Sequence, residues 1–455
     1  MEGALNRIVH SPVPILARLF GMGTIRRALD RAGVEAILAG VERRVYGPPG
    51  LAGYEATHRP ELARLARRSL AQYLAQRALV RSAPLRGGQD ALVLLALPAI
   101  AGILALRSLA EARRSGGSAE PGRVVIQATE SLRRLVEPVF ADERPVYHAG
   151  RSPWLGPAEV GFLLRLFGRC PRSLLHPRYV AIQLRHVAYL GGLVRRHRPR
   201  SVVSCIEDSS ASSVLTAFLR ERGIAHRNQM HGEKFFFPPD AFAEFDEFGV
   251  WGEAFRELYE ALRIRARFRI TGNPVHRALF AGPRGSVRPA TILILHSMLL
   301  DAEATYRDSL LELLSGLPGP WRVGVRLHYN ELEHGARFLA RLRAEGVRRG
   351  WSFEIEERSH RSPLEEDLAW ARVAVGAQST ALIDAWVAGC RVVHLRGASF
   401  GGRAILERYG GSPNVAYLDE GADVAAFLSR PADLDAVEDR RVDRLTSVLA
   451  PPGSP

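Results

Sequence analysis

Apolar and polar positions follow two different periods along this chain. Residues 1 to about 85 follow a helical period, with apolar residues opposite arginines in the stretch 61–70. From Arg123 onward, short β-rich runs alternate with helical stretches, in two blocks separated by the Gly/Pro-rich segment 281–289. Such alternation predicts parallel sheets covered by helices.

The strands of the first block are predicted at 124–126, 145–147, 201–206, 225–229, 247–251 and 267–271. Those of the second block are predicted at 291–295, 322–327, 351–355, 373–375 and 391–395. Helices are expected at 178–196, 211–222, 253–262, 303–314, 334–349, 363–370 and 380–388. The fold class is therefore α/β, with two Rossmann-like, doubly wound parallel-sheet domains.

This pattern divides the chain into four parts. Residues 1–120 are expected to form a helical, basic region, with membrane association as one possibility. The N-terminal Rossmann-like domain is predicted at 121–275, the C-terminal one at 276–430 and a tail at 431–455. Ala91 to Leu106 is almost wholly apolar, but shorter than the roughly 20 residues that span a bilayer. We expect a buried strand followed by a buried helix there. A segment that dips into a membrane, helped by Arg107, Arg113 and Arg114, is the alternative. The basic face at 61–70 is expected to be solvated, with contact to anionic lipid as its alternative.

The composition of the chain limits the kinds of molecule that it is expected to bind. With a net charge of +14 and a pI near 10.4, the chain should bind polyanions. It has no zinc finger, RNP-type strand or basic heptads, which disfavours nucleic acid and favours phosphates and an anionic membrane surface. Its three cysteines are far apart, as expected in a reducing cytosol, and the N-terminus does not resemble a secretory signal.

Several enzyme classes lack their motifs here. No GxGxxG follows the first strand of either block and no GxxxxGK[ST] occurs, which excludes typical nicotinamide dehydrogenases and P-loop enzymes. HExxH, DxD and a serine nucleophile elbow are also missing, so we expect neither a metal nor a cofactor.

Ligands of open parallel sheets bind beyond the carboxyl ends of the strands, so the candidate residues are sought there. Glu207 and Asp208 follow strand 201–206, and either could act as a general base. Asp208 and Ser209 could instead cap the next helix. His231 follows strand 225–229 and suits proton transfer near neutral pH, with a structural histidine as the alternative.

Lys234 is the one lysine among 62 basic residues, which a genome biased against lysine codons would explain. A compact ammonium cannot be replaced by a planar guanidinium where a single phosphate oxygen must be met. A functional role for Lys234 and a lysine present by chance are therefore equal alternatives.

The second block offers phosphate ligands. Arg326 and His328 end strand 322–327 and suit a nucleotide phosphate. Ser379 and Thr380 precede a helix whose free N–H groups favour anions, although N-capping explains one hydroxyl. Gly272 lies in a tight Thr-Gly-Asn-Pro turn between the blocks, where a hinge is favoured.

The order of these motifs resembles the GT-B glycosyltransferases of bacterial surface polysaccharide and capsule synthesis. The similar families are the CDP-glycerol glycerophosphotransferases and the bacterial sialyl- and polysialyltransferases. The matching residues are His231-Gly232 with Lys234, Thr271 to Pro274, Arg326 to His328, Ser379-Thr380 with Asp384, and the acidic pair Glu207-Asp208. They span about Ser201 to Leu395, less than half the chain.

This resemblance implies two Rossmann-like domains facing a cleft and a metal-independent, inverting transfer from a nucleotide-activated donor, CMP- or CDP-linked. His328, Ser379 and Thr380 would hold the donor phosphates, with Arg326, Gly272 and Lys234 nearby. His231, Glu207 or Asp208 would deprotonate a polysaccharide or lipid-linked acceptor. The enzyme would be cytoplasmic and peripheral on the inner face of the cell membrane.

Two alternatives stay open. One is a nucleotide-sugar epimerase or hydrolase of the same fold. The other is a non-catalytic, membrane-associated envelope assembly protein, which would account for two departures from the family pattern. Tyr329 stands where the family has proline, and Ser209 where it has glycine.

Overall fold

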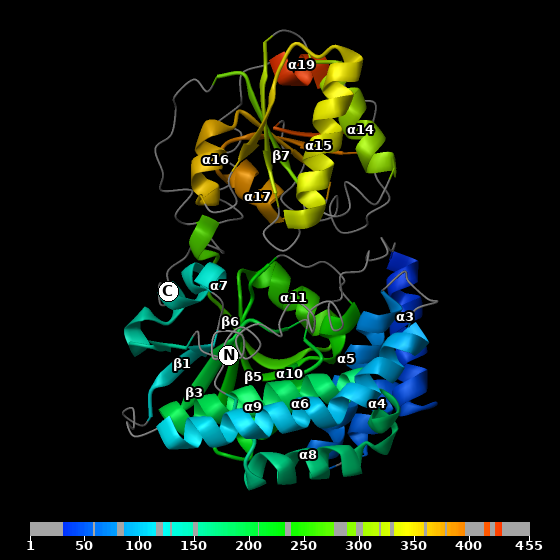
Figure 1. The fold of residues 1–455 in the computed structure, drawn as a ribbon, viewed down its shortest axis with the longest axis vertical. Helices are drawn as coiled ribbons and strands as arrows, with labels where there is room; N and C mark the ends of the chain where they lie inside the picture. The colour runs from blue at the N-terminus through cyan, green and yellow to red at the C-terminus, as the bar shows by residue number, and fades with distance from the viewer. Residues whose placement is uncertain are drawn as a thin grey trace, which may run out of the picture. The chain divides into compact units, whose positions relative to one another are not determined.

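The computed structural model describes residues 31–57, 60–79, 86–114, 122–127, 130–148, 153–207, 209–232, 238–276, 289–296, 304–317, 320–327, 332–358, 362–377, 380–395, 414–418 and 424–429. The chain divides into two compact units, each built on one sheet (Figure 1). Described residues from Ala32 to His231 and from Pro238 to Ile270 form the first unit. Those from Thr271 onward form most of the second.

The first unit contains a six-stranded parallel sheet in the order β2-β1-β3-β4-β5-β6. Its strands are β1 (Val124–Gln127), β2 (Val146–Tyr147), β3 (Ser201–Ser204), β4 (Ala225–Gln229), β5 (Glu244–Val250) and β6 (Arg265–Ile270). Its helices are α3 (Arg31–Tyr46), α4 (Gly50–Ala56), α5 (Glu61–Ala78), α6 (Arg86–Arg114), α7 (Glu130–Val136), α8 (Pro157–Arg169), α9 (Pro177–His197), α10 (Ser212–Arg220) and α11 (Glu253–Ala261). Short 3₁₀ turns lie at η1 (Glu137–Val139), η2 (Ala141–Glu143), η3 (Pro171–Leu175) and η4 (Pro238–Phe242).

The second unit has another six-stranded parallel sheet, in the order β12-β11-β10-β7-β8-β9. Its strands are β7 (Thr291–Leu295), β8 (Arg322–Arg326), β9 (Ile355–Arg358), β10 (Val373–Gly376), β11 (Arg391–His394) and β12 (Val415–Tyr417). Its helices are α14 (Ala304–Ser315), α15 (Leu332–Arg349), α16 (Leu364–Trp370), α17 (Thr380–Val387) and α19 (Val424–Ser429).

Both sheets are doubly wound, which confirms the predicted fold class. The chain changes direction across the sheet between β1 and β3 in the first unit, and between β7 and β10 in the second. Every residue of β3, β7, β10 and β11 is buried, because helices cover both faces of a parallel sheet. Such switch points are where open α/β sheets bind ligands.

The predicted strands are found, with two differences at the sheet margin. β9 begins at Ile355 rather than at Trp351. The indole of Trp351 stacks on Phe353 at 5.2 Å, and both rings pack on the apolar core beside the sheet. The alternation of apolar and polar residues just before β9 therefore reflects the packing of these two rings on the core. β12 was not predicted from the sequence.

The expected buried strand and helix at Ala91 to Leu106 are wrong. This stretch lies within the single helix α6, and Leu95 and Leu106 are 77% and 67% exposed. Pro98 and Gly102 lie within this helix, on its exposed side. Among the described residues, we find no helix with the length and apolar character needed to cross a membrane.

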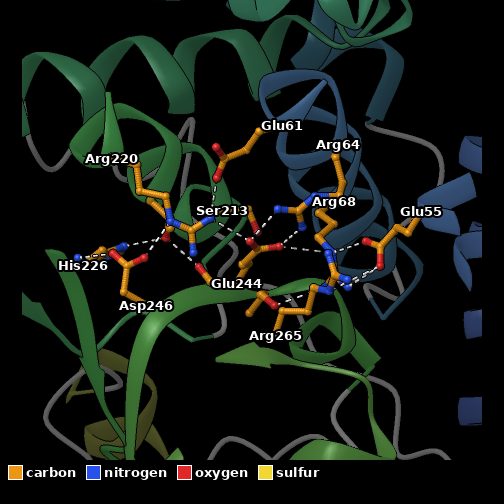
Figure 2. Close-up of polar contacts among 12 residues, drawn as sticks. Glu55, Glu61, Arg64, Arg68, Ser213, Arg220, His226, Glu244, Asp246 and Arg265 are labelled. Atoms are coloured by element: carbon orange, nitrogen blue, oxygen red, sulfur yellow. Dashed lines mark hydrogen bonds and ion pairs between the residues drawn. The ribbon is translucent and has the colours of Figure 1, made fainter. Parts of the chain in front are cut away.

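The basic face of α5 is not solvated as expected. Figure 2 shows Arg64 and Arg68 pointing to carboxylates of the first unit. Arg64 Nη2 donates to Glu244 Oε1 at 2.7 Å, and Arg68, 1% exposed, donates through Nε to Glu55 at 2.6 Å. Arg220 from α10 also donates to Glu244, at 2.9 Å. The N-terminal helix α5 is thus joined to β5 by buried ion pairs.

Glu244 is the centre of this cluster. Burial would raise its pKa, but the hydrogen bonds and charges of Arg64, Arg68 and Arg220 outweigh burial and hold the pKa below its usual value. A carboxylate that is 3% exposed stays ionised here because three guanidinium groups replace its hydration.

Candidate functional site

The carboxyl end of the first sheet brings Glu207 and His231 together. β3 and β4 are adjacent and parallel, with Ser204 opposite Asn228. Glu207 follows β3 and His231 follows β4, so both side chains leave the sheet at the same end. Glu207 Oε1 lies 2.8 Å from His231 Nδ1. These are two of the three base candidates from the sequence, the third being Asp208.

Neighbouring amides fix the carboxylate. Asn228 donates from Nδ2 to Glu207 Oε2 at 3.0 Å, and its Oδ1 accepts the Ile206 N–H at 2.8 Å. Gln72 of α5 donates to the backbone oxygen of Glu207 at 2.7 Å. Glu207 is fully buried, whereas the His231 side chain is 23% exposed.

Because one side chain is buried and the other is partly exposed, the two residues can take different chemical roles. A carboxylate at Nδ1 favours the tautomer that carries its proton there, which leaves Nε2 to accept a proton from a ligand. Glu207 is enclosed and already accepts hydrogen bonds, so a bound acceptor cannot reach it without displacing them. Of the two, His231 is the group that solvent and ligands can reach.

The other candidates of this unit are less informative. Asp208 and Lys234 lie outside the described residues. Ser209 Oγ accepts the Ala211 N–H at 3.2 Å in a local turn before α10. The N-cap of α10 is Ala211, and no side chain caps this helix, so the capping alternative is wrong for Ser209.

The second unit presents its switch point between β7 and β10. β10 leads into α17, of which Thr380 is the first residue, and β8 lies on the other side of β7. His328, Ser379 and the side chain of Thr380 lie outside the described part of the chain, so their role as phosphate ligands stays a prediction. The strands that precede them are nevertheless neighbours of β7 at the switch point.

The turn at Gly272 is built around two residues. Gly272 has a φ of +68°, which glycine adopts without strain, and the division between the units falls just before this turn, after Ile270. Asn273 Oδ1 accepts the Val275 N–H at 3.0 Å, which fixes the start of a short helical turn.

That turn presents a histidine the sequence analysis did not select. His276 Nε2 lies 2.9 Å from Asp384 Oδ1 on α17, and its side chain is 2% exposed. The pair ties the turn to the helix whose N-terminus holds the predicted phosphate ligands. A histidine two residues after Asn273-Pro274 was visible in the sequence, but no spacing rule connects it to Asp384, 108 residues away.

Arg326 is engaged within its own unit. Its guanidinium is paired with Asp367 of α16 through Nη1, and Nη2 donates to the Ser362 carbonyl at 2.9 Å. Arg358 of β9 donates to the other oxygen of Asp367 at 2.7 Å. A phosphate contact by Arg326 therefore has to use the remaining N–H groups or replace one of these bonds.

No family model and no curated protein sequence matches this chain. It is similar in structure to a UDP-forming trehalose-phosphate synthase from Burkholderia xenovorans, with 11% identity, coverage of 72% of this chain and 95% of that one, and a TM-score of 0.43. The UDP-GlcNAc 2-epimerase from Methanocaldococcus jannaschii, in complex with UDP-GlcNAc and UDP, is 10% identical over 69% of this chain and 94% of its own, with a TM-score of 0.45.

The wall teichoic acid polymerase TagF is 10% identical over 81% of this chain and 94% of its own, with a TM-score of 0.39. Transferases and an epimerase are thus both among the similar structures. Likenesses at these scores do not decide between activities, so the functional argument rests on the residues of this chain.

Proposed function

We propose that this protein is a metal-independent, inverting GT-B transferase. It moves a sugar, or a polyol phosphate, from a nucleotide-activated donor to a hydroxyl of a polysaccharide or lipid-linked acceptor. The observation that carries the proposal is the Glu207–His231 pair at the carboxyl end of the first parallel sheet. The order of motifs along the chain supports the family resemblance.

In this proposal His231 is the general base and Glu207 its positioning residue. His231 Nε2 takes the acceptor hydroxyl proton as the oxygen attacks the donor carbon, and the carbon–oxygen bond to the leaving phosphate breaks on the opposite face. Glu207 stabilises the imidazolium that forms, as a buried carboxylate does beside a histidine. For a polyol-phosphate donor the attacked atom is phosphorus, and the same base serves.

The donor binds to the second unit at the β7/β10 switch point. Ser379, Thr380 and the N-terminus of α17 hold the leaving phosphate, with His328 after β8, and Lys234, Gly272 and Arg326 complete the donor site. The charge that develops on the leaving group meets fixed N–H and O–H donors and cations, so the chemistry requires no metal. The family resemblance favours a cytidine-linked donor. The acceptor is presented at the anionic inner face of the cell membrane.

Nucleotide binding tests the proposal. A thermal-shift screen of CMP, CDP, UDP and GDP should raise the melting temperature with a cytidine nucleotide, because a ligand of the folded state stabilises it. In titration calorimetry, His328→Ala and Ser379→Ala should weaken that binding. His231→Ala should leave it unchanged, because His231 acts on the acceptor. Nucleotide affinity that survives both donor-site substitutions contradicts the assignment. Release of free sugar without an acceptor selects the epimerase or hydrolase alternative, and no nucleotide binding at all selects the assembly protein.

A further inference from the structure

Helix α6 presents a continuous apolar surface to solvent. Its exposed residues between 91 and 106 recur every three or four positions along one side of the helix: Ala91, Leu94, Leu95, Pro98, Ala99, Gly102, Ile103, Ala105 and Leu106. None of them is polar. At about 1.5 Å per residue this apolar stripe is roughly 24 Å long.

The opposite side of α6 is part of the protein core. Val93 and Leu104 are buried, and α6 packs along α9. Ser108 Oγ donates to Leu104 O and accepts the Leu155 N–H at 2.7 Å, which fixes the end of α6 beside the segment that enters α8. The helix is therefore held with one side against the first unit and the apolar stripe outward. Figure 1 shows α6 in the outer helical layer of this unit.

Two further elements that contact α9, as α6 does, also expose large apolar side chains. Leu164 on α8 is 68% exposed, and Leu175 in η3 is 76% exposed. Exposed arginines accompany them, Arg169 at the end of α8 and Arg172 in η3. Of the ten large hydrophobic residues that are exposed in the described part of the chain, eight lie on α6, α8 and η3: Leu94, Leu95, Ile103, Leu106, Val160, Leu164, Leu174 and Leu175.

We propose that the α6 stripe is the surface by which the protein docks on an anionic lipid membrane, with the helix parallel to the membrane plane. Exposed leucine and isoleucine side chains enter the headgroup boundary, and a net charge of +14, to which the exposed Arg169 and Arg172 contribute, favours anionic lipid. A 16-residue apolar stretch is too short to span the roughly 30 Å hydrocarbon layer, and its other side is already packed on α9.

Charge distinguishes lipid from a second copy of this chain as the occupant. Two copies apposed along α6 would each carry a net charge of +14 and would repel each other. An anionic membrane attracts the same positive charge. Membrane docking by α6 does not depend on the proposed function. Only the nature of the acceptor that the membrane presents rests on it.

Vesicle binding without any donor tests the inference separately from catalysis. The full-length protein should co-sediment with vesicles of equal parts phosphatidylglycerol and phosphatidylcholine, and much less with phosphatidylcholine alone. Leu95→Glu and Leu106→Glu should each lower the partition coefficient roughly tenfold or more, because one buried leucine side chain is lost and a charge is added. Val347→Glu is the matched control, since Val347 is 86% exposed on α15, and it should bind as the wild type does.

A depth-sensitive probe separates insertion from simple charge attraction. Cys170, Cys205 and Cys390 are all buried, so a dye that reacts with thiols should label Leu95→Cys selectively. Its fluorescence should shift to the blue on anionic vesicles and keep the shift in high salt, whereas labelled Val347→Cys should not respond. Binding that salt abolishes, with no shift at residue 95, overturns the proposal. So does a concentration-dependent dimer that Leu95→Glu dissociates in a protein that does not bind vesicles. Nucleotide affinity should be the same in all of these variants, so failure here leaves the transferase proposal standing.

Discussion

Glu207 Oε1 lies 2.8 Å from His231 Nδ1, with the carboxylate fully enclosed and the imidazole partly open. The two residues follow adjacent strands. Asn228 donates to the other carboxylate oxygen of Glu207, and Gln72 donates to its backbone carbonyl. An ionised carboxylate is buried at high cost unless hydrogen bonds and a cation or a proton donor compensate. The arrangement therefore makes His231 the residue that meets the ligand, and Glu207 the residue that holds it.

Replacing the two residues should separate these roles. His231→Ala should lower kcat roughly 10²- to 10⁴-fold, the usual loss of a general base, and leave the affinity for the donor nucleotide unchanged. Glu207→Gln should lower kcat by less, because the imidazole stays in place but loses the compensating charge. Initial rates with varied acceptor, together with calorimetry for the donor, measure both effects.

Glu221→Gln is the control, since Glu221 lies at the exposed end of α10 and pairs with Arg165 at 2.7 Å. It should retain wild-type kcat. If His231→Ala keeps full activity, the acceptor is deprotonated by another group and the role assigned to the pair is wrong.

The His276–Asp384 contact should be coupled to donor binding. His276→Ala and Asp384→Ala should each weaken nucleotide affinity, because both release α17 from the turn at Asn273. The double variant should be little worse than either single one, with a coupling energy of about 0.5–3 kcal/mol. Calorimetric titration of the four proteins gives this energy directly, and additive losses would show that the contact has no part in holding the donor site.

Much of this fold can be read from the sequence, because parallel strands covered on both faces appear as short, continuous apolar runs. Val373 to Val375 and Thr291 to Leu295 were predicted at the positions where the structure has them. The residue after a strand can be assigned to the ligand-binding end of a sheet, and for this reason Glu207 and His231 were selected before their contact was known.

The spacing of apolar residues within a helix or strand does not show which distant parts of the chain pack against it. Arg64 and Arg68 form a basic stripe that looks solvated, yet the acid that buries them, Glu244, is about 180 residues further along the chain. Ala91 to Leu106 looks buried because it is apolar, and only the packing of α9 against one side shows that the other side is exposed. His276 was missed for the same reason, since its partner is distant in sequence.

Removing Glu244 should destabilise the first unit severely. Glu244→Gln leaves Arg64, which is 12% exposed, without its carboxylate partner, whereas Arg220 keeps Asp246. Breaking a buried pair in this way typically costs about 3–5 kcal/mol. Denaturant unfolding followed by circular dichroism measures the loss. Glu345→Gln is a matched control, because Glu345 pairs with Arg348 and Arg349 on the exposed side of α15 and should leave the unfolding midpoint unchanged. If both substitutions change the unfolding midpoint equally, burial of the Glu244 cluster contributes nothing to stability.

The buried imidazole of His226 should make folding sensitive to mild acid. Burial lowers the pKa of His226 from its ordinary 6.5 to about 4, and its ring nitrogens contact Ser204 Oγ at 2.9 Å and Thr216 Oγ1 at 2.7 Å. Between pH 6.5 and 4 the unfolded chain takes up a proton that the folded chain does not. This contribution to stability is therefore complete above pH 6.5 and is lost as the pH falls to 4, by roughly 3 kcal/mol in total at 1.36 kcal/mol per pKa unit.

His226→Gln should flatten the dependence of the free energy of unfolding on pH within this window, although the variant starts from lower stability. Urea titrations at several pH values between 6.5 and 4.5 give the slope for each protein. Glu345→Gln should keep the wild-type slope in the upper part of this window, above about pH 5.5. There the carboxyl is ionised in both states, because its pKa is 4.5 in the unfolded chain and is lowered to about 2 in the folded one. A slope that His226→Gln leaves intact would assign the acid sensitivity to His176 or His197, since burial also lowers the pKa of each.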